Sequence, residues 1–299
     1  MPQVIVGVAG ANRQVKKMVI GVGGANRDCK EAWAGVGGVN RKVFASGIPL
    51  GELPLGTLVK DVNSAYFESS VVWMIADKNH AGYPGNSVTL LSKYILCLKC
   101  FDAKESGNQG DNRWIYSNIR QWLNSAAGAG QWYTPAKSGD TPPASPYTDY
   151  NRYQTEAGFL NGFTTEFQQA LLPYAGDKMY LLSSYETYYN GQSSASWGSP
   201  LSIFPTSSPS ARQAYPTQQA IDRCSAGGMS GWMYGSTWDW WLRDNYSSTE
   251  TFSVYRNGNN NYYKVPNEGR FGIRPACNVS SSINVSSDPE SGGIYTIQW

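Results

Sequence analysis

Few residues of this 299-residue chain could support acid–base or nucleophilic chemistry. The single histidine, His80, is followed by Ala-Gly-Tyr-Pro, a sequence typical of a turn. A serine hydrolase of the α/β type would also carry a Gly-x-Ser-x-Gly turn, and the chain has none. We therefore expect His80 to be a surface or turn residue rather than the base of a catalytic triad.

The five cysteines offer thiolate or metal chemistry, but their spacing does not define a site. Cys97 and Cys100 form one Cys-x-x-Cys pair, without the second pair or the histidines of a typical zinc site. A zinc site is thus the less favoured reading, and two cysteines on a half-buried strand the preferred one. The other three are Cys29, Cys224 and Cys277, and an odd, sparse set is unlike a secreted disulfide framework. We expect no metal and no cofactor.

Carboxylates could act in pairs, as glycoside hydrolysis requires. Asp239 with Asp244, and Glu250 with Glu268, are such pairs in principle, yet 22 acidic residues make pairs easy to name. Nothing in the spacing singles out either pair. The sequence therefore favours a binding protein over an enzyme.

The strongest signal for binding is a polar, tyrosine-rich segment near the C-terminus. Residues 244–263 read DNYSSTETFSVYRNGNNNYY, in which Asn, Tyr, Ser and Thr make up 14 of 20 positions. Tyrosine supplies a rigid contact surface at low entropic cost, and Asn and Ser add adaptable hydrogen bonds. The predicted ligand-binding residues are Tyr234, Ser236, Asp239, Asp244, Asn245, Tyr246, Ser248, Thr249, Tyr255, Asn257, Asn259, Asn260, Asn261 and Tyr262.

The surrounding residues are expected to be scaffold. Trp240, Trp241 and Leu242 would pack in the core, while Arg243 and Arg274 would hold loops through carboxylate or carbonyl contacts. A solvated loop above a tryptophan-rich core is the alternative interpretation of the polar segment.

Composition excludes several classes of partner. Charged residues make up 15% of the chain and the formal net charge is +2, so no nucleic-acid footprint or polybasic membrane patch is expected. The N-terminus lacks the apolar run of a signal peptide, and no stretch approaches the ~20 apolar residues of a membrane span. We expect synthesis in the cytoplasm and, for a protein acting outside the cell, release by a route such as lysis.

The elements that must position these residues divide the chain near residue 46. Residues 46–299 read as one α+β unit. Apolar patterning predicts strands over 70–76 and 178–183 and an amphipathic helix over 114–125. A second helix is predicted over 163–172, with Thr164 or Thr165 as its N-cap and Pro173 beyond its end. From Trp232 onward, short strands and turns are expected.

The first 45 residues repeat with a period of 14. Gly-Val-x-Gly-x-Asn-Arg-like units end at Arg13, Arg27 and Arg41, and each fits two short strands around a glycine-containing turn. The glycines lack the spacing and the lysine of a phosphate-binding loop. A single hairpin cannot bury a face alone, so we expect the repeats to stack on each other or on neighbouring chains.

Several motifs of the larger unit resemble a known family. They are residues 73–80 (WMIADKNH), 117–125 (SNIRQWLNS), 177–183 (DKMYLLS), 241–243 (WLR) and 272–279 (GIRPACNV). This series resembles a domain family of Firmicutes and their phages that is similar to the C-type-lectin fold of formylglycine-generating enzymes and of retroelement-diversified variable proteins. The N-terminal repeats resemble those preceding such domains in phage structural proteins.

The resemblance implies a role for the segment between WLR and GIRPA. In retroelement-diversified proteins, mutagenised adenine-rich codons yield Asn, Tyr, Ser, Thr and Asp, which matches residues 244–263 and predicts a variable-type segment near 232–276. Formylglycine-generating relatives use a reactive cysteine pair, for which Cys224 and Cys277 are candidates by position alone. Sugar-binding members use calcium with Glu-Pro-Asn-type motifs, and the nearest string here is Pro266-Asn267-Glu268.

Together these observations predict a C-type-lectin-like α+β domain at 46–299, preceded by β-hairpin repeats at 1–45 for attachment or oligomerisation. The resemblance implies a retroelement-diversified receptor-binding protein of a phage or prophage tail, located on the virion or the bacterial surface. Its partners would be a bacterial surface protein or glycan, phage tail components contacted through the repeats, and other copies of the chain, for instance in a trimer. A fixed-specificity surface lectin or adhesin and a formylglycine-generating-type enzyme are the alternatives.

Overall fold

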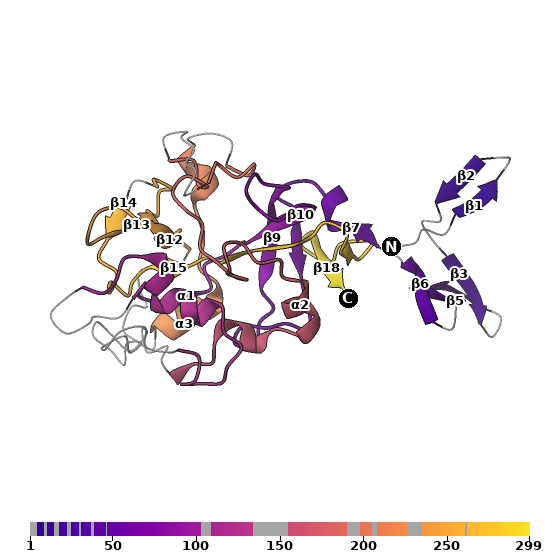
Figure 1. Cartoon of the computed structure of the whole chain (residues 1–299), viewed down its shortest axis with the longest axis horizontal. Coiled ribbons are helices and arrows are strands. Elements are labelled where there is room, and N and C mark those ends of the chain that lie inside the picture. The colour runs from indigo at the N-terminus through magenta and orange to yellow at the C-terminus, as the bar shows by residue number, and fades with distance from the viewer. Residues whose placement is uncertain are drawn as a thin grey trace.

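In the computed structural model, the large C-terminal unit contains two β-sheets with short helices packed beside them (Figure 1). The structure describes residues 47–102, 109–133, 155–189, 198–204, 208–225, 235–260 and 262–299, and the backbone of six strands before residue 46. The sheet-rich mixture with few helices agrees with the predicted α+β class. None of the described helices is long and apolar enough to cross a membrane.

Three antiparallel hairpins form the N-terminal region, one for each 14-residue repeat. They pair β1 (Ile5–Val8) with β2 (Ala11–Gln14), β3 (Met18–Val22) with β4 (Ala25–Cys29), and β5 (Glu31–Val36) with β6 (Val39–Ala45). The Asn-Arg of each repeat lies at the start of the second strand, as the strand-turn-strand prediction requires. Each hairpin is a two-stranded sheet of its own within the described residues.

The larger sheet has seven strands in the order β16-β10-β9-β8-β18-β17-β7. Neighbours pair antiparallel except for β8 and β18, which run parallel. The strands are β7 (Ile48–Pro49), β8 (Leu58–Lys60), β9 (Val72–Lys78), β10 (Ser87–Ser92), β16 (Ala276–Ser280), β17 (Asn284–Val285) and β18 (Ile294–Gln298). The predicted strand at 70–76 is thus confirmed as β9, shifted by two residues.

The smaller sheet has the order β11-β15-β12-β13-β14 and contains most of the polar segment. Its strands are β11 (Cys97–Leu98), β12 (Trp240–Asn245), β13 (Thr251–Val254), β14 (Tyr262–Lys264) and β15 (Gly272–Ile273). The run β12–β13–β14 is an antiparallel meander with β14 at the sheet edge. Its two connecting turns therefore lie at opposite ends of β13.

The helices are short and begin at side-chain caps. In α2 (Thr165–Ala170), the hydroxyl of Thr164 accepts from the backbone N–H of Phe167, which confirms the predicted helix and resolves its N-cap. The predicted helix at 114–125 is split into the 3-10 turn η2 (Trp114–Tyr116) and α1 (Asn118–Leu123). Ser117 caps α1 by accepting from Arg120, so it interrupts the longer helix. The remaining elements are α3 (Gln218–Ser225), η1 (Leu50–Glu52), η5 (Phe159–Gly162) and η7 (Pro209–Arg212).

Two neighbouring tryptophans of β12 enter two different clusters of the hydrophobic core. Trp241 packs in the cluster that contains Trp73 and Trp122, while Trp240 packs in the cluster that contains Phe204. Successive strand side chains point to opposite faces, so both faces of β12 are buried. The expectation that Trp240, Trp241 and Leu242 are scaffold is correct, since all three are 0% exposed.

The predicted strand at 178–183 is wrong. Only Tyr180 of that stretch bridges to another strand, by reciprocal backbone hydrogen bonds with Ala276 of β16. The side chain of Asn124 instead accepts from the backbone N–H groups of Lys178 and Met179. The apolar run is buried between the two core clusters and makes one β-bridge. The spacing of its apolar residues is the same as in a buried strand, so the sequence pattern cannot distinguish the two.

Candidate functional site

Most predicted contact residues that the structure describes lie on the β12–β13–β14 meander, and they divide by exposure. Exposed residues are Ser236, Asn245, Tyr246, Ser248, Thr249, Asn257 and Asn259, while Tyr255 and Tyr262 are half-buried. Asp239, Asp244 and Asn260 are buried. Tyr234 and Asn261 lie outside the described residues.

The exposed residues form two groups at opposite ends of β13. One group is the turn between β12 and β13 together with Tyr263 of β14, and we name residues 245–250 plus Tyr263 the display tip. The other group surrounds the turn at 255–260. Because β13 spans four residues, the groups are roughly 10 Å apart. A large protein partner could cover both groups, whereas a small ligand would contact one.

The display tip is a tight turn that backbone hydrogen bonds and the side chain of Asn112 hold in place. The backbone N–H groups of Tyr246 and Ser247 donate to the carbonyl of Glu250 at 2.8 and 3.3 Å. The side-chain amide of Asn112 donates to the carbonyls of Ser247 and Glu250 at 2.7 and 3.2 Å. These bonds hold the backbone of the turn, and the side chains of Tyr246, Ser248 and Thr249 are exposed on its surface.

Two exposed aromatic rings stack on each other at the display tip. The rings of Tyr246 and Tyr263 are parallel within 3°, with centroids 3.7 Å apart. Tyr246 also contacts Phe252 edge-on, which ties the pair to the second core cluster. A hydrogen bond with Tyr263 raises the pKa of Tyr246. The prediction omitted Tyr263, which is 36% exposed, although it ends the polar segment and shares its composition.

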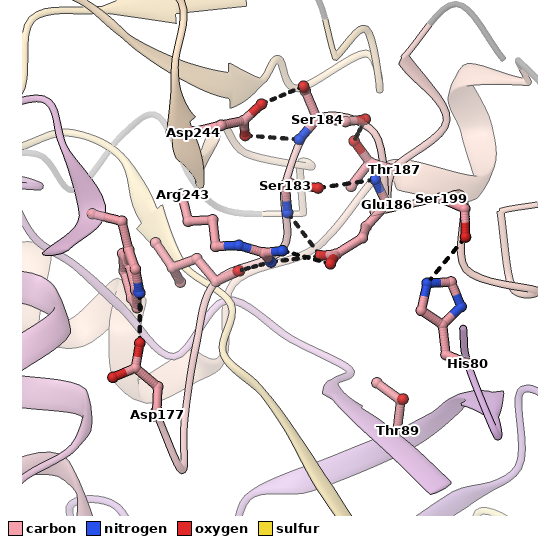
Figure 2. Close-up of polar contacts among 12 residues, drawn as sticks. His80, Thr89, Asp177, Ser183, Ser184, Glu186, Thr187, Ser199, Arg243 and Asp244 are labelled. Carbon is pink, nitrogen blue, oxygen red and sulfur yellow. Dashed lines mark hydrogen bonds and ion pairs between the residues drawn. The ribbon is translucent and has the colours of Figure 1, made fainter. Parts of the chain in front are cut away.

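Asp244 marks the boundary between the tip and the scaffold. Its carboxylate accepts hydrogen bonds from both the backbone N–H and the hydroxyl of Ser184, and it is 1% exposed (Figure 2). Burial raises the pKa of Asp244 to about 6, against the opposing effect of these hydrogen bonds. The prediction that Asp244 contacts a ligand is corrected, because its oxygens are directed at a neighbouring loop.

A buried ion pair lies one residue before Asp244. The Arg243 guanidinium donates to both oxygens of Glu186 at 2.6 Å, and also to the carbonyl of Leu181 (Figure 2). Burial alone would lower the pKa of Arg243, but the charge and hydrogen bonds of Glu186 outweigh burial and raise the pKa. Arg243 therefore holds a loop through carboxylate and carbonyl contacts, as its scaffold role predicts.

Asp239 and Asn260 also hold the scaffold together. Asp239 accepts from the backbone N–H of Arg256 at 2.7 Å, and burial outweighs the Arg256 charge and raises its pKa. Asn260 donates to the carbonyl of Thr187 at 2.8 Å. Both residues were predicted to contact a ligand. That prediction is corrected, because both are less than 10% exposed and their polar groups bond to internal partners.

The four cysteines whose side chains the structure describes are all buried. Cys97 and Cys100 are buried on and just after β11, and burial raises the pKa of Cys97. Burial also raises the pKa of Cys277, which is fully enclosed. Raised values suppress the thiolate form that reacts. The side chain of Cys224 lies outside the described residues, and no three His, Cys, Asp or Glu side chains within them gather as metal ligands.

His80 differs from the sequence expectation. It follows β9 in a turn, but it is buried at 7% exposure and its Nδ1 lies 2.6 Å from Asp77 Oδ2. The carboxylate three residues earlier was a local signal of this pairing, since Asp77 lies at the end of β9 and His80 follows that strand by two residues.

Comparison with known proteins identifies one family. The model of a domain of unknown function, DUF6273, matches residues 85–281, which include the whole β12–β13–β14 meander. No curated protein and no solved structure gives a significant match. Since the matched region covers more than half of the chain, the protein belongs to the DUF6273 family.

Proposed function

We propose that the protein is a ligand-binding display module whose contact surface is centred on the display tip. The stacked, exposed pair of Tyr246 and Tyr263 is the observation that carries this proposal. Neighbouring aromatic rings on a soluble surface are typical of interaction sites, because each ring offers a large contact area and a polar tip. Their mutual stacking fixes both rings before any ligand arrives, which lowers the entropic cost of binding.

The scaffold beneath the tip supports a display role. Asp244 and Arg243 anchor the end of β12 to residues 184 and 186, while Asn112 anchors the turn itself. Substitutions at exposed positions such as Ser248 and Thr249 would leave these contacts in place. A fixed scaffold with interchangeable surface residues is what a diversified binding protein requires.

The finer assignment follows from the resemblance. We infer a C-type-lectin-type domain diversified by a retroelement, in a phage or prophage tail or on a bacterial surface. The Asn, Tyr, Ser and Thr content of residues 244–263 supports it, as does the exposure of many of those side chains. The N-terminal hairpins would attach the domain to tail components or join copies of the chain, whose multiple tips would raise a weak single-site affinity.

The inferred partner is a bacterial surface protein or glycan. A tyrosine pair can stack against a sugar ring or a flat protein side chain, and the exposed amide and hydroxyls of Asn245, Ser248 and Thr249 can donate and accept hydrogen bonds. The net charge of +2 does not favour a polyanionic ligand.

Binding of the fluorescently labelled full chain to intact cells of the encoding bacterium, or of the host of the encoding phage, tests this function. Tyr246→Ala and Tyr263→Ala should each weaken binding about tenfold or more, as buried aromatic anchors do. Tyr215→Ala is the matched control, because Tyr215 is 53% exposed and lies outside the tip. Equal binding by all four proteins would contradict the proposal.

A fixed-specificity lectin or adhesin using the same tip is the close alternative, and sequence variation at the tip distinguishes the two.

An enzyme of the formylglycine-generating type is the alternative from another class. The burial and raised pKa of Cys277 argue against a reactive cysteine pair at this position. Alkylation of the native protein under conditions that leave it folded would test that enzyme directly.

A further inference from the structure

Outside the display tip, Asp77, His80 and Ser199 are linked in series by two side-chain contacts, and we call these three residues the relay. No sequence motif predicts this arrangement. His80 Nδ1 lies 2.6 Å from Asp77 Oδ2, and on the other side of the ring Nε2 lies 3.4 Å from the hydroxyl of Ser199. The His80 and Ser199 end of this relay is visible in Figure 2. When Nδ1 carries the proton and donates it to Asp77, Nε2 is free to accept from Ser199.

Asp77 is fixed independently of the histidine. One carboxylate oxygen accepts from the backbone N–H of Lys78 and the hydroxyl of Ser202, both at 2.7 Å. The oxygen that faces His80 also accepts from the backbone N–H of Ser202 at 3.0 Å. Burial would raise the pKa of Asp77, but the hydrogen bonds from His80, Ser202 and Lys78 together outweigh burial and lower the pKa from its ordinary value. The carboxylate is therefore ionised at neutral pH and can orient the imidazole and stabilise its protonated form.

The segment that carries Ser199 is held against the same corner of the fold. The backbone N–H groups of Leu201 and Ile203 donate to the carbonyls of Glu186 and Ala76 at 3.0 Å. Gly198 precedes the serine at φ +93°, and a Cβ there would lie 3.0 Å from a carboxylate oxygen of Glu186. This glycine permits a sharp turn immediately before Ser199, which is half-buried.

Exposure increases from Asp77 and His80 to Ser199, which is the arrangement expected when the serine is a nucleophile. The side chains of Asp77 and His80 are 6% and 4% exposed, whereas Ser199 at the end of the relay is half-buried. In addition, the backbone N–H of Ser199 donates to no acceptor within the described part of the chain. An N–H of the nucleophile itself can stabilise an oxyanion, as in known serine hydrolases.

We propose that Ser199 is an activated nucleophile toward carboxylic esters, with His80 as its general base and Asp77 as the positioning residue. The hydroxyl oxygen of Ser199 attacks the ester carbonyl carbon while its proton moves to His80 Nε2. The ester C–O bond then breaks, and His80 returns the proton to the leaving alcohol. Water hydrolyses the acyl-serine in the same manner and releases the carboxylic acid. A contact distance of 3.4 Å is typical of such sites before a substrate binds.

The test is labelling of the full chain with a small fluorophosphonate, followed by intact mass and peptide mapping. We expect one adduct, located on Ser199, and none in Ser199→Ala. His80→Gln should slow labelling about 100-fold or more, because general-base assistance contributes ~10²–10⁴. Ser208→Ala, which removes an exposed serine away from the relay, should label at the wild-type rate.

Hydrolysis of p-nitrophenyl acetate separates positioning from structure. Asp77→Asn should lower kcat while leaving KM unchanged, since the histidine loses its orienting carboxylate but the ester still reaches Ser199. The proposal is overturned if the folded wild-type protein takes no label, if the label lies on another residue, or if His80→Gln labels as fast as wild type. Any of these results would make the three residues a structural link between β9 and residues 199–202.

Discussion

The guanidinium of Arg243 and the carboxylate of Glu186 face each other across two hydrogen bonds of 2.6 Å in the interior beneath the display tip. Glu186 is fully buried, and one of its oxygens also accepts from the backbone N–H of Ser183 at 2.9 Å. The pair thus ties the loop at 183–189 to the last residues of β12. We expect the rigidity of the tip to depend on this connection.

Breaking that pair should destabilise the whole domain. Arg243→Ala leaves the Glu186 carboxylate buried without its partner, so we expect the free energy of unfolding to fall by about 3–5 kcal/mol in a urea titration. Arg113→Ala is the control, because the Arg113 side chain that pairs with Asp111 is 53% exposed, and such an ion pair should contribute about 0–1 kcal/mol. Similar losses for the two variants would show that the Arg243–Glu186 pair is not a structural anchor.

Asp244 should make stability depend on pH in a defined direction. Its folded pKa of about 6 is above the ordinary 3.8, so the folded state binds more protons than the unfolded state between those values. Stability from this group is therefore complete below pH 4 and is lost as pH rises through 6, by about 3 kcal/mol. Asp244→Asn removes the titration. The difference in unfolding free energy between wild type and variant should favour wild type more at pH 4 than at pH 7.5, whereas a constant difference would refute the raised pKa.

Gly258 should not tolerate a side chain. It has φ +87°, and an added Cβ would lie 1.8 Å from the carbonyl oxygen of Pro209. Gly82 has a similar φ of +84° but open space around the Cβ position. We expect Gly82→Ala to cost about 1–2 kcal/mol from backbone strain alone, and Gly258→Ala to cost clearly more. Equal melting temperatures for the two variants would contradict the close approach of the 255–260 turn to Pro209.

The N-terminal hairpins should determine oligomeric state. Each is a two-stranded sheet, and an isolated hairpin is marginally stable in water, so stacking with other copies would stabilise it. We expect light scattering to find an oligomer for the full chain and a monomer after removal of residues 1–45. If both proteins contain the same number of chains per particle, the hairpins do not associate.

Local patterns in the sequence were enough to predict several elements. The threonine cap at 164 or 165, the following helix and the 14-residue hairpin period are all determined by neighbours within a few positions, and the structure contains all three, with Thr164 as the cap. The two tryptophans of β12 were correctly assigned to the core because large apolar rings rarely remain exposed. The mixed α+β class followed from the same local evidence.

Long-range contacts account for the errors. Asp244 and Asn260 resemble their exposed neighbours in composition, and only the loop at 183–189, more than fifty residues away, makes them internal. Asn124 captures the backbone of residues 178–179, which prevents a regular strand there. His80 and Ser199 are separated by 119 residues, so their contact follows from the packing of residues 198–204 on β9 and from no local motif.

The most direct test of the central claim is to sequence the coding region for residues 230–278 across many clones of the source population. We predict substitutions at the exposed positions, namely Asn245, Tyr246, Ser248, Thr249, Asn257, Asn259 and Tyr263. The buried positions Asp244, Phe252, Val254, Gly258 and Asn260 should be invariant, and a near-copy repeat and a reverse transcriptase gene should lie nearby. An invariant segment without a repeat, or variation spread equally over buried and exposed positions, would contradict a diversified display surface.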